Sequence, residues 1–346
     1  MLHIRPLLSG AEAASVAGAD AIPQAAASRE SGTSVHAASP NLLKLALWMS
    51  GTLTAFIVAA LSVRALQDTI NAFEMMTIRS AGGLVILCAL GALRPSLWSG
   101  VRRHRMSLQG LRNVAHFGSQ ICWTVAITML PFATVFALEF TIPAWVTLLA
   151  VLFLGERMST SRALALALCV AGVVVILRPG HEAFQSAALI MLVGALLFAI
   201  AAIATKKLIT TETTFSIMLW MNLMQLPLNF VGSDPAFIFK IDASLALPLI
   251  GIASAGLVIH YCLANAFRYG DAMVVIPMDF LRVPLIAVIG WAFYGENPDF
   301  YVFAGAGLIV LGVLWNLRGE AQRNDALAEA SRPPPEHGAK PRAAGP

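Results

Sequence analysis

The stretch FALEFTIPAW, residues 136–145, carries a glutamate, Glu139, in the middle of an apolar run, and IPMDFLRVPL, residues 276–285, carries Asp279 in the same setting. An offset of 140 residues superposes the two acids. The same ungapped offset superposes further identities: Gly155-Glu156 on Gly295-Glu296, Cys122 on Cys262, Phe140 on Phe280, Phe153 on Phe293, Gly172 on Gly312 and Leu177-Arg178 on Leu317-Arg318. The chain is therefore a duplicated unit. Because a carboxylate in hydrocarbon is costly, a duplicated apolar unit with buried acids is typical of secondary transporters.

The composition indicates an integral membrane protein. Hydrophobic residues make up 58% of the 346 residues and charged residues 12%, and the mean hydropathy is +0.75, which lies outside the range of ordinary soluble domains. A membrane-spanning helix needs about 20 apolar residues, so ten spans would use roughly 200 of them. We therefore expect short loops, two tails and no separate soluble domain.

Apolar runs interrupted by glycine, proline or charge predict an all-α membrane protein with ten transmembrane helices. The predicted spans are 42–63, 70–93, 108–129, 132–154, 161–178, 186–206, 212–232, 244–267, 272–294 and 299–317. Residues 42–180 would form a first five-helix repeat and residues 181–318 a second. The segments 1–41 and 319–346 are expected to be disordered cytoplasmic tails, since neither can bury a core.

The distribution of cations predicts the orientation. Most lysines and arginines fall in alternate loops and in the tails, whereas only Arg64, Arg178 and Lys240 fall on the other side. Cytoplasmic loops collect such cations, so we expect a multi-pass protein of the inner membrane with both termini in the cytoplasm. The net charge of +4 thus reflects orientation rather than affinity for nucleic acid. Because five is an odd number, the second repeat must be inverted relative to the first.

The inversion predicts the depth of the two acids. Glu139 lies about eight residues into a span entered from outside, and Asp279 about eight into a span entered from inside, so both lie roughly 12 Å deep. Asp279 and Arg282 are one helical turn apart and can neutralise each other. For Glu139 no cation lies within one turn, which leaves Arg79 or Arg282 as its partner. A carboxylate without a partner at this depth could carry a proton.

Arg79 lies about halfway through the second predicted span, where a guanidinium is costly unless paired. It could neutralise Glu139 or hold a substrate carboxylate through two hydrogen bonds. The corresponding stretch of the second half, FSIMLWMNLMQ, has no arginine. A ligand with two different ends would require such asymmetry, although ordinary divergence also explains it.

Polar side chains recur on one face of the third predicted span: Asn113, His116 and Gln120, with Thr124 one turn further and Trp123 alongside. They could contact a ligand or form hydrogen bonds between helices. In the eighth span Tyr261 and Asn265 share a face, with His260 adjacent, and His260 could take part in proton coupling or form a neutral contact between helices.

Together these features resemble the drug/metabolite transporter superfamily, specifically its EamA-domain carriers. The resemblance covers residues 42–318 and includes the closing pattern of each copy, FLGERMSTSRALALALCVAGVVVILRP and FYGENPDFYVFAGAGLIVLGVLWNLR. The stretch FEMMTIRSAGG, residues 73–83, is similar to that of alphaproteobacterial uptake carriers for S-adenosylmethionine or riboflavin. The resemblance implies a central cavity lined mainly by the third, fourth, eighth and ninth spans, with alternating access.

The expected function is therefore secondary transport of a small polar organic metabolite, such as S-adenosylmethionine, riboflavin or an amino-acid-like substrate, coupled to protons or running as an exchange. Candidate binding or coupling residues are Arg79, Asn113, His116, Gln120, Trp123, Glu139, Tyr261, Asn265, Asp279 and Arg282. No phosphate loop, nucleophile triad, metal motif or paired cysteine spacing occurs, so we expect neither enzyme activity nor a cofactor. An intramembrane enzyme, such as a lipid-modifying transferase, and a passive channel are the alternatives. The sequence allows a homodimer but does not require one.

Overall fold

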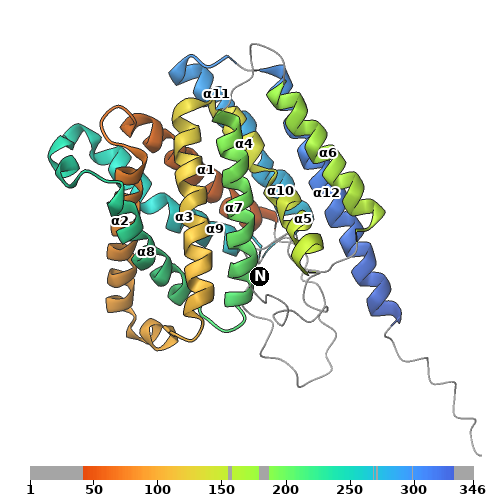
Figure 1. Ribbon diagram of the computed structural model, residues 1–346, viewed down its shortest axis with the longest axis horizontal. Coiled ribbons are helices and arrows are strands. Elements are labelled where there is room, and N and C mark those ends of the chain that lie inside the picture. Colours follow the sequence, from red (N-terminus) through yellow and green to blue (C-terminus); the bar gives the residue numbers. More distant parts are fainter. Residues whose placement is uncertain are drawn as a thin grey trace, which may run out of the picture.

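The computed structural model describes residues 42–154, 158–178, 187–267, 269, 272–297 and 299–330, which form helices and turns without a strand in those ranges. Figure 1 shows the helices side by side in one bundle. They are α1 (Leu42–Leu66), α2 (Ala72–Leu93), α3 (Met106–Met129), α4 (Phe132–Glu139), α5 (Ile142–Leu154), α6 (Thr160–Leu177), α7 (Ala187–Leu208), α8 (Thr214–Val231), α9 (Ala246–Ala266), α10 (Ala272–Phe280), α11 (Arg282–Tyr294) and α12 (Phe300–Ala330). The short 3-10 helices η2 (Pro95–Gly100), η3 (Pro235–Lys240) and η4 (Ala243–Leu245) lie in the connections.

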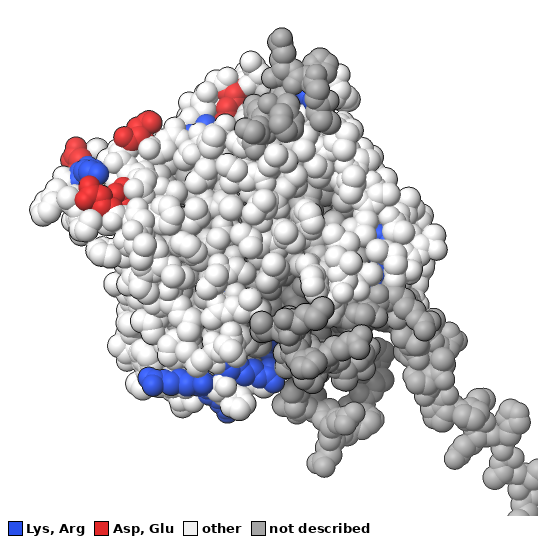
Figure 2. Space-filling model, viewed as in Figure 1, with Lys and Arg blue, Asp and Glu red and all other residues white. Residues whose placement is uncertain are grey.

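Eight helical stretches among the described residues are long and apolar enough to cross a membrane. Two of them, Phe132–Phe153 and Val274–Tyr294, run through the breaks between α4 and α5 and between α10 and α11. The helices α3 and α8 are not among the eight; polar side chains such as His116 and Gln225 are buried inside the bundle on these two helices. The chain is therefore a multi-pass membrane protein. Figure 2 shows a wide zone that is almost free of charge, between an end with basic residues and an end where acidic and basic residues are mixed.

The predicted fourth and ninth spans are both interrupted next to their acids. The helix α4 ends at Glu139 and α10 ends at Phe280, one residue beyond Asp279. Pro143 is the second residue of α5 and Pro284 the third of α11. Proline has no N–H to bond to the carbonyl four residues earlier, so each helix restarts there.

Helices of the two copies pack against each other in a reciprocal pattern. The first helix of each copy packs on the third helix of the other, since α1 contacts α9 and α7 contacts α3. The second helices, α2 and α8, form a pair, and the fifth helices, α6 and α12, form another at the opposite edge of the bundle (Figure 1). Between α6 and α12, Gly172 and Gly305 bring their backbones so close that a Cβ on either residue would overlap the carbonyl of the other.

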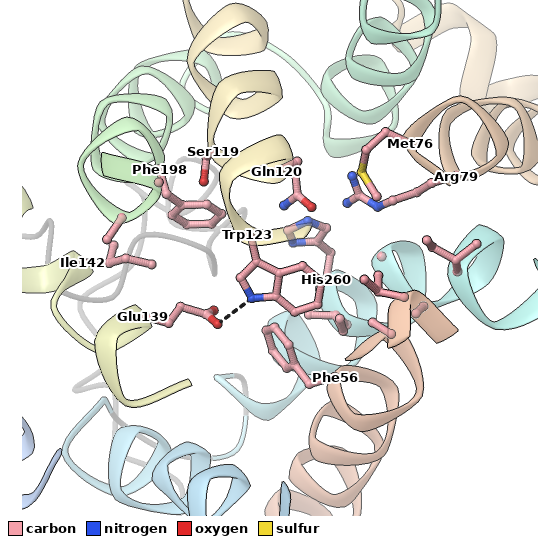
Figure 3. A pocket seen from close by; sticks show the side chains of 18 of the residues that line it. Phe56, Met76, Arg79, Ser119, Gln120, Trp123, Glu139, Ile142, Phe198 and His260 are labelled. Carbon is pink, nitrogen blue, oxygen red and sulfur yellow. Dashed lines mark hydrogen bonds between the residues drawn. The ribbon is translucent and has the colours of Figure 1, made fainter. Parts of the chain in front are cut away.

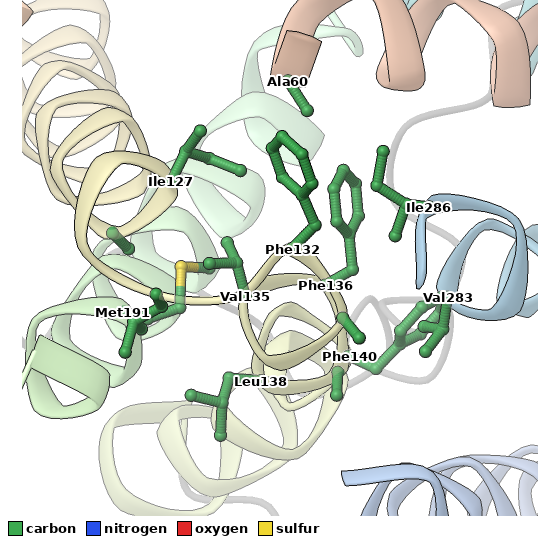
Figure 4. Close-up of a cluster of buried hydrophobic side chains, with 14 of the residues drawn as sticks. Ala60, Ile127, Phe132, Val135, Phe136, Leu138, Phe140, Met191, Val283 and Ile286 are labelled. Carbon is green, nitrogen blue, oxygen red and sulfur yellow. The ribbon is translucent and has the colours of Figure 1, made fainter. Parts of the chain in front are cut away.

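The helix α4 lies in the centre of the bundle. All its residues from Phe132 to Leu138 are buried, and Figure 4 shows them among Ile127 of α3, Met191 of α7 and Ile286 of α11. A helix with apolar residues on every side is stable only when its neighbours cover it completely. This packing holds the end of α4, and with it Glu139, at a fixed place between the two copies.

The structure corrects the predicted start of the C-terminal tail. The helix α12 continues to Ala330, so residues 319–330 are helical rather than disordered. Alanine, leucine, glutamate and glutamine have high helix propensity, and they extend a helix that has already formed without needing burial. The predicted tails at 1–41 and 331–346 lie outside the described residues.

Candidate functional site

A cavity lies among seven helices of the bundle and contains about 830 Å³ of space between side chains, part of it open to the outside. The helices α1 to α5 of the first copy and α7 and α9 of the second provide its walls. Its polar lining is Arg79, Ser119, Gln120, Trp123, Glu139 and His260 (Figure 3). Its larger apolar lining residues are Phe56, Val63, Met76, Ile142, Met191, Phe198, Ile252, Ile259 and Leu263. Both copies therefore contribute to one site.

Glu139 reaches the cavity from the end of α4 and pairs with a cation of the second copy. Arg282 Nη1 lies 3.2 Å from Glu139 Oε1, and Arg282 Nη2 lies 3.4 Å from Asp279 Oδ2. The indole Nε1 of Trp123 donates to Glu139 Oε2 at 3.1 Å (Figure 3). Of the two partners predicted for Glu139, the structure selects Arg282. Asp279 and Arg282 do not line the cavity and act on it through Glu139.

Arg282 is almost fully enclosed, with its side chain 6% exposed. Its guanidinium carbon lies 4.3 Å from the ring centre of Phe56, 4.5 Å from that of Phe140 and 5.4 Å from that of Phe136. Aromatic faces attract a cation electrostatically and exclude water around it. The enclosure fixes the guanidinium between the two carboxylates and keeps the charge of Glu139 compensated.

Arg79 is half-buried in the wall of the cavity, on the side away from Glu139 and close to Gln120 and His260 (Figure 3). Among the described residues, no carboxylate lies within ion-pair distance of Arg79 and no side chain accepts a hydrogen bond from it. A pair between Arg79 and Glu139, one of the two alternatives that the sequence left open, is not formed. The guanidinium donors of Arg79 therefore remain available to a ligand.

The polar face of α3 divides between the cavity and the neighbouring helix α8. Gln120 and Trp123 line the cavity, whereas Asn113 and His116 do not. The Nε2 of Gln225 lies 2.9 Å from His116 Nδ1. Asn113 Nδ2 donates to the carbonyl of Trp220 at 3.4 Å and contacts the Met224 sulfur at 3.0 Å. Asn113 and His116 thus join two helices and are not placed to contact a ligand in this cavity.

Two candidates on α9 are placed outside the cavity. Tyr261 is 65% exposed, with its ring 5.6 Å from that of Trp48 at an edge-to-face angle of 82°. Asn265 Nδ2 donates to the carbonyl of Tyr261 at 2.8 Å. His260 lines the cavity instead, because successive helical residues differ by about 100° in direction. Tyr261 and Asn265 thus do not line this cavity, and their contact with a ligand stays a prediction.

A second ion pair joins the two copies, and its cation, Arg64, directly follows the lining residue Val63 in the sequence. Arg64 Nη1 lies 3.0 Å from Glu296 Oε1, and Arg64 also donates to the carbonyls of Ile127 at 2.9 Å and Leu130 at 2.8 Å. The other oxygen of Glu296 accepts from the N–H of Phe132 at 2.9 Å. This cluster joins the end of α1, the turn before α4 and the turn after α11.

Two segments of the chain, residues 43–178 and 185–318, match the EamA-like transporter family. The chain belongs to this family. It is 34% identical over 203 residues to a riboflavin transporter of Rhizobium johnstonii, covering 58% of this chain and 67% of that protein. It is 27% identical over 210 residues to an S-adenosylmethionine uptake transporter of Rickettsia felis, covering 61% of this chain and 71% of that protein.

Another relative is named as an exporter, whereas the Rickettsia felis protein is named as an uptake transporter. This EamA-like protein is 29% identical over 270 residues to a pseudopaline exporter of Pseudomonas aeruginosa, covering 75% of this chain and 90% of the exporter. A crystal structure superposes with a TM-score of 0.53 at 14% identity, covering 81% of this chain and 99% of that chain. The superposition supports the fold, and the relatives place the chain among membrane transporters.

The structure adds lining residues of this EamA-like protein that the sequence pattern did not indicate. Phe56 and Phe198 stand in the cavity walls (Figure 3), together with the small residues Gly194, Ala195, Ala255 and Gly256. Apolar residues in an apolar span carry no signal that separates a cavity wall from a lipid face. The only usable signal is the concentration of small residues on α7 and α9. Among the described residues no group of three His, Cys, Asp or Glu side chains could hold a metal ion.

Proposed function

We propose that this EamA-like protein is a secondary carrier of the inner membrane that moves a small polar organic metabolite by alternating access. In this proposal ten spans form two inverted five-helix repeats, with α3 and α8 crossing the membrane as well, and both termini lie in the cytoplasm. The observation that carries the proposal is one cavity lined by helices of both copies, with Arg79 and Glu139 on opposite sides of it. Such a site between repeats is typical of secondary transporters.

The lining favours a substrate that combines an anionic group with a planar ring. Arg79 offers a guanidinium whose geometry matches a carboxylate. Trp123, Phe56 and Phe198 offer aromatic surface to a ring system. S-adenosylmethionine has both a carboxylate and an adenine ring, and it is named for several of the relatives. We take it as the first substrate to test.

Riboflavin is the second candidate, favoured by the 34% identity to the Rhizobium johnstonii transporter. Its flat ring system suits the same aromatic side chains. It has no carboxylate for Arg79, so a riboflavin carrier would have to use this guanidinium as a donor to carbonyl or hydroxyl oxygens. The effect of Arg79 substitutions on the two substrates separates the candidates.

The reaction cycle needs the cavity to open alternately to the two sides. The cluster of Arg64 and Glu296 ties the two copies together at one end, which we assign to the outer side from the distribution of cations. Opening there must break this ion pair. Glu139 is the group best placed to couple the cycle to protons, because it faces the cavity and has a charge partner in the other copy.

The test is uptake by proteoliposomes that contain the purified protein. Saturable uptake of labelled S-adenosylmethionine that is accelerated by unlabelled substrate inside the vesicles is expected for a carrier. Uptake that does not saturate and shows no such acceleration would indicate a channel, and appearance of a chemically altered product would indicate an enzyme. Empty liposomes are the control.

A thermal-shift screen on the same protein identifies the ligand class. A ligand that binds the folded state raises the apparent melting temperature by mass action. S-adenosylmethionine, riboflavin, amino acids and nucleosides form the screen. Stabilisation by none of them would remove the proposed substrate class. Arg79→Lys is expected to abolish most of the shift with S-adenosylmethionine, because an ammonium cannot form the two parallel hydrogen bonds.

A further inference from the structure

We infer that Gly256 is a positioning residue that fixes the guanidinium of Arg79 and thereby makes the carrier selective for substrates with a carboxylate. The inference rests on the proposed function and deepens it, since it names the group of the substrate that this part of the cavity binds. Gly256 has no side chain of its own to contact a ligand. It acts by the space that it leaves for Arg79.

The guanidinium of Arg79 lies against the backbone of α9 at Gly256. A Cβ added to Gly256 would stand 2.8 Å from Arg79 Nη2, 3.1 Å from Nε and 3.3 Å from Cζ. Non-bonded heavy atoms of this kind prefer separations of about 3.5–4.0 Å. The planar group therefore occupies the place that any larger residue at position 256 would fill.

Moving the two helices apart to make room would break close packing one turn away. One turn along α2, Gly82 lies so close to Ala253 of α9 that a Cβ on the glycine would overlap the alanine side chain. The helices α2 and α9 thus share a seam of small residues, with Arg79 at one level and Gly82 at the next. A methyl group at position 256 would have to displace the flexible guanidinium, because the packed backbones on both sides are less mobile.

Polar side chains of α8 do not hold Arg79 in place. Asn222 donates to the carbonyl of Met218, and Asn229 donates to the carbonyl of Met76 and the hydroxyl of Ser80. Among the described residues, no hydrogen bond or ion pair anchors the guanidinium. Contact with α9 at Gly256 is therefore what determines its direction, and its donors stay directed at the cavity beside Gln120 and His260 (Figure 3).

Displacement of the Arg79 guanidinium should weaken binding of the substrate carboxylate and leave binding of the rest of the substrate unchanged. Two parallel hydrogen bonds to a carboxylate tolerate little misplacement. The rings that would bind adenine belong to α1, α3 and α7, whereas Gly256 belongs to α9 and the atoms nearest to its added Cβ are those of Arg79. A substrate without the carboxylate should therefore be insensitive to a change at position 256. This difference separates a positioning role from a general loss of packing.

The experiment measures initial rates of uptake into proteoliposomes for two labelled probes, S-adenosylmethionine and decarboxylated S-adenosylmethionine. The variants are Gly256→Ala, Arg79→Gln and the double variant. The matched control is Gly307→Ala, a helical glycine of α12 that has no atom within 4 Å of an added Cβ. Purified protein is checked for a single peak in size-exclusion chromatography before reconstitution.

Gly256→Ala is expected to raise KM for S-adenosylmethionine about tenfold, as the loss of one charge-assisted hydrogen bond would, with the maximal rate within about twofold of wild type. KM for the decarboxylated probe should not change. Arg79→Gln should raise KM for S-adenosylmethionine at least as much, and adding Gly256→Ala to it should have no further effect. Gly307→Ala should behave as wild type with both probes.

Three results would overturn the inference: an unchanged KM for S-adenosylmethionine in Gly256→Ala, an equal rise for both probes, or a further rise when Gly256→Ala is added to Arg79→Gln. In each of these cases uptake by wild type and its loss in Arg79→Gln would leave the proposed function intact. Absence of uptake of both probes by wild type would remove the proposed substrate class, and the inference with it.

Discussion

The guanidinium of Arg282 lies 3.2 Å from Glu139 Oε1, so a cation of the second copy neutralises the carboxylate that faces the cavity from the first. The same guanidinium also meets Asp279, one turn before it on the chain. Three charged groups from two copies therefore form one cluster inside the bundle. Arg282 is buried and the two carboxylates are mostly buried, which makes the cluster sensitive to the loss of any one charge.

Arg282→Gln is expected to destabilise the protein strongly. The substitution removes the guanidinium that Glu139 and Asp279 share, and breaking a buried ion pair by removing one partner costs about 3–5 kcal/mol. The melting temperature of the purified protein in detergent measures the effect. The double variant Glu139→Gln/Arg282→Gln should recover part of the loss. Lys240→Gln is the control, because its pair with Asp234 is exposed, and it should leave the melting temperature nearly unchanged.

Glu139→Gln is expected to abolish uptake driven by a proton gradient while exchange of labelled for unlabelled substrate continues. Glutamine keeps the shape of the side chain but cannot release or accept a proton near neutral pH. The measurement compares uptake into proteoliposomes with an imposed pH gradient against exchange at equal pH. Gradient-driven uptake that persists and keeps its pH dependence in the variant would remove Glu139 from proton coupling.

Glu296→Gln is expected to favour opening of the bundle at the end where Arg64 and Glu296 join the two copies. Loss of the negative charge leaves Arg64 with only neutral acceptors, the carbonyls of Ile127 and Leu130. In a background without native cysteines, Val63→Cys reports on access to the cavity. A membrane-impermeant maleimide added outside should label it several-fold faster when Glu296→Gln is present.

The matched control for this labelling is Arg178→Gln. The pair of Arg178 with Asp299 also joins the two copies, but it is about one-third exposed and lies at the junction of α6 and α12, away from the cavity. Its removal should not alter labelling of Val63→Cys. Equal labelling with and without Glu296→Gln would show that the Arg64 cluster does not control access.

Trp123→Phe and Tyr261→Leu are expected to differ, although both change an aromatic residue predicted to contact ligand. Trp123 lines the cavity and donates to Glu139, so loss of the indole N–H should raise KM about fivefold, the usual effect of one hydrogen bond. Tyr261 faces outward, so its replacement should leave KM unchanged. A rise in KM for Tyr261→Leu equal to that for Trp123→Phe would contradict this assignment of the cavity.

Much of the fold is predictable because apolar length and repetition are direct consequences of the bilayer. The duplication at an offset of 140 residues follows from the sequence, and the prolines Pro143 and Pro284 account for the breaks that the structure shows beside them. The structure of residues 319–330 was harder to predict. Their composition excludes a core, which predicts disorder, but a helix that continues an existing one needs no core.

The site was only partly predictable, since helical spacing gives the direction of a side chain around its own axis and says nothing about which neighbour stands at that level. Asn113 and Gln120 share a face of α3, yet they have different neighbours. Asn113 contacts α8, whereas Gln120, about two turns further along α3, lines the cavity. Arg282 and Asp279 were paired correctly because their contact is local. The pair between Arg282 and Glu139 spans 143 positions, and spacing left it open between two arginines.

The two broken helices meet at residues that the duplication makes equivalent. Phe140 and Phe280, 140 positions apart, face each other with ring centres 5.5 Å apart at an angle of 68°. A contact between equivalent positions lies on the approximate two-fold axis that relates the two copies. Interchanging the copies therefore leaves this contact unchanged. Any rocking motion that treats the halves alike must leave these two rings together while regions further out separate. The aromatic pair would then lie at the pivot of the rocking motion. The size of the side chains at these two positions would limit the angle through which the two halves rotate.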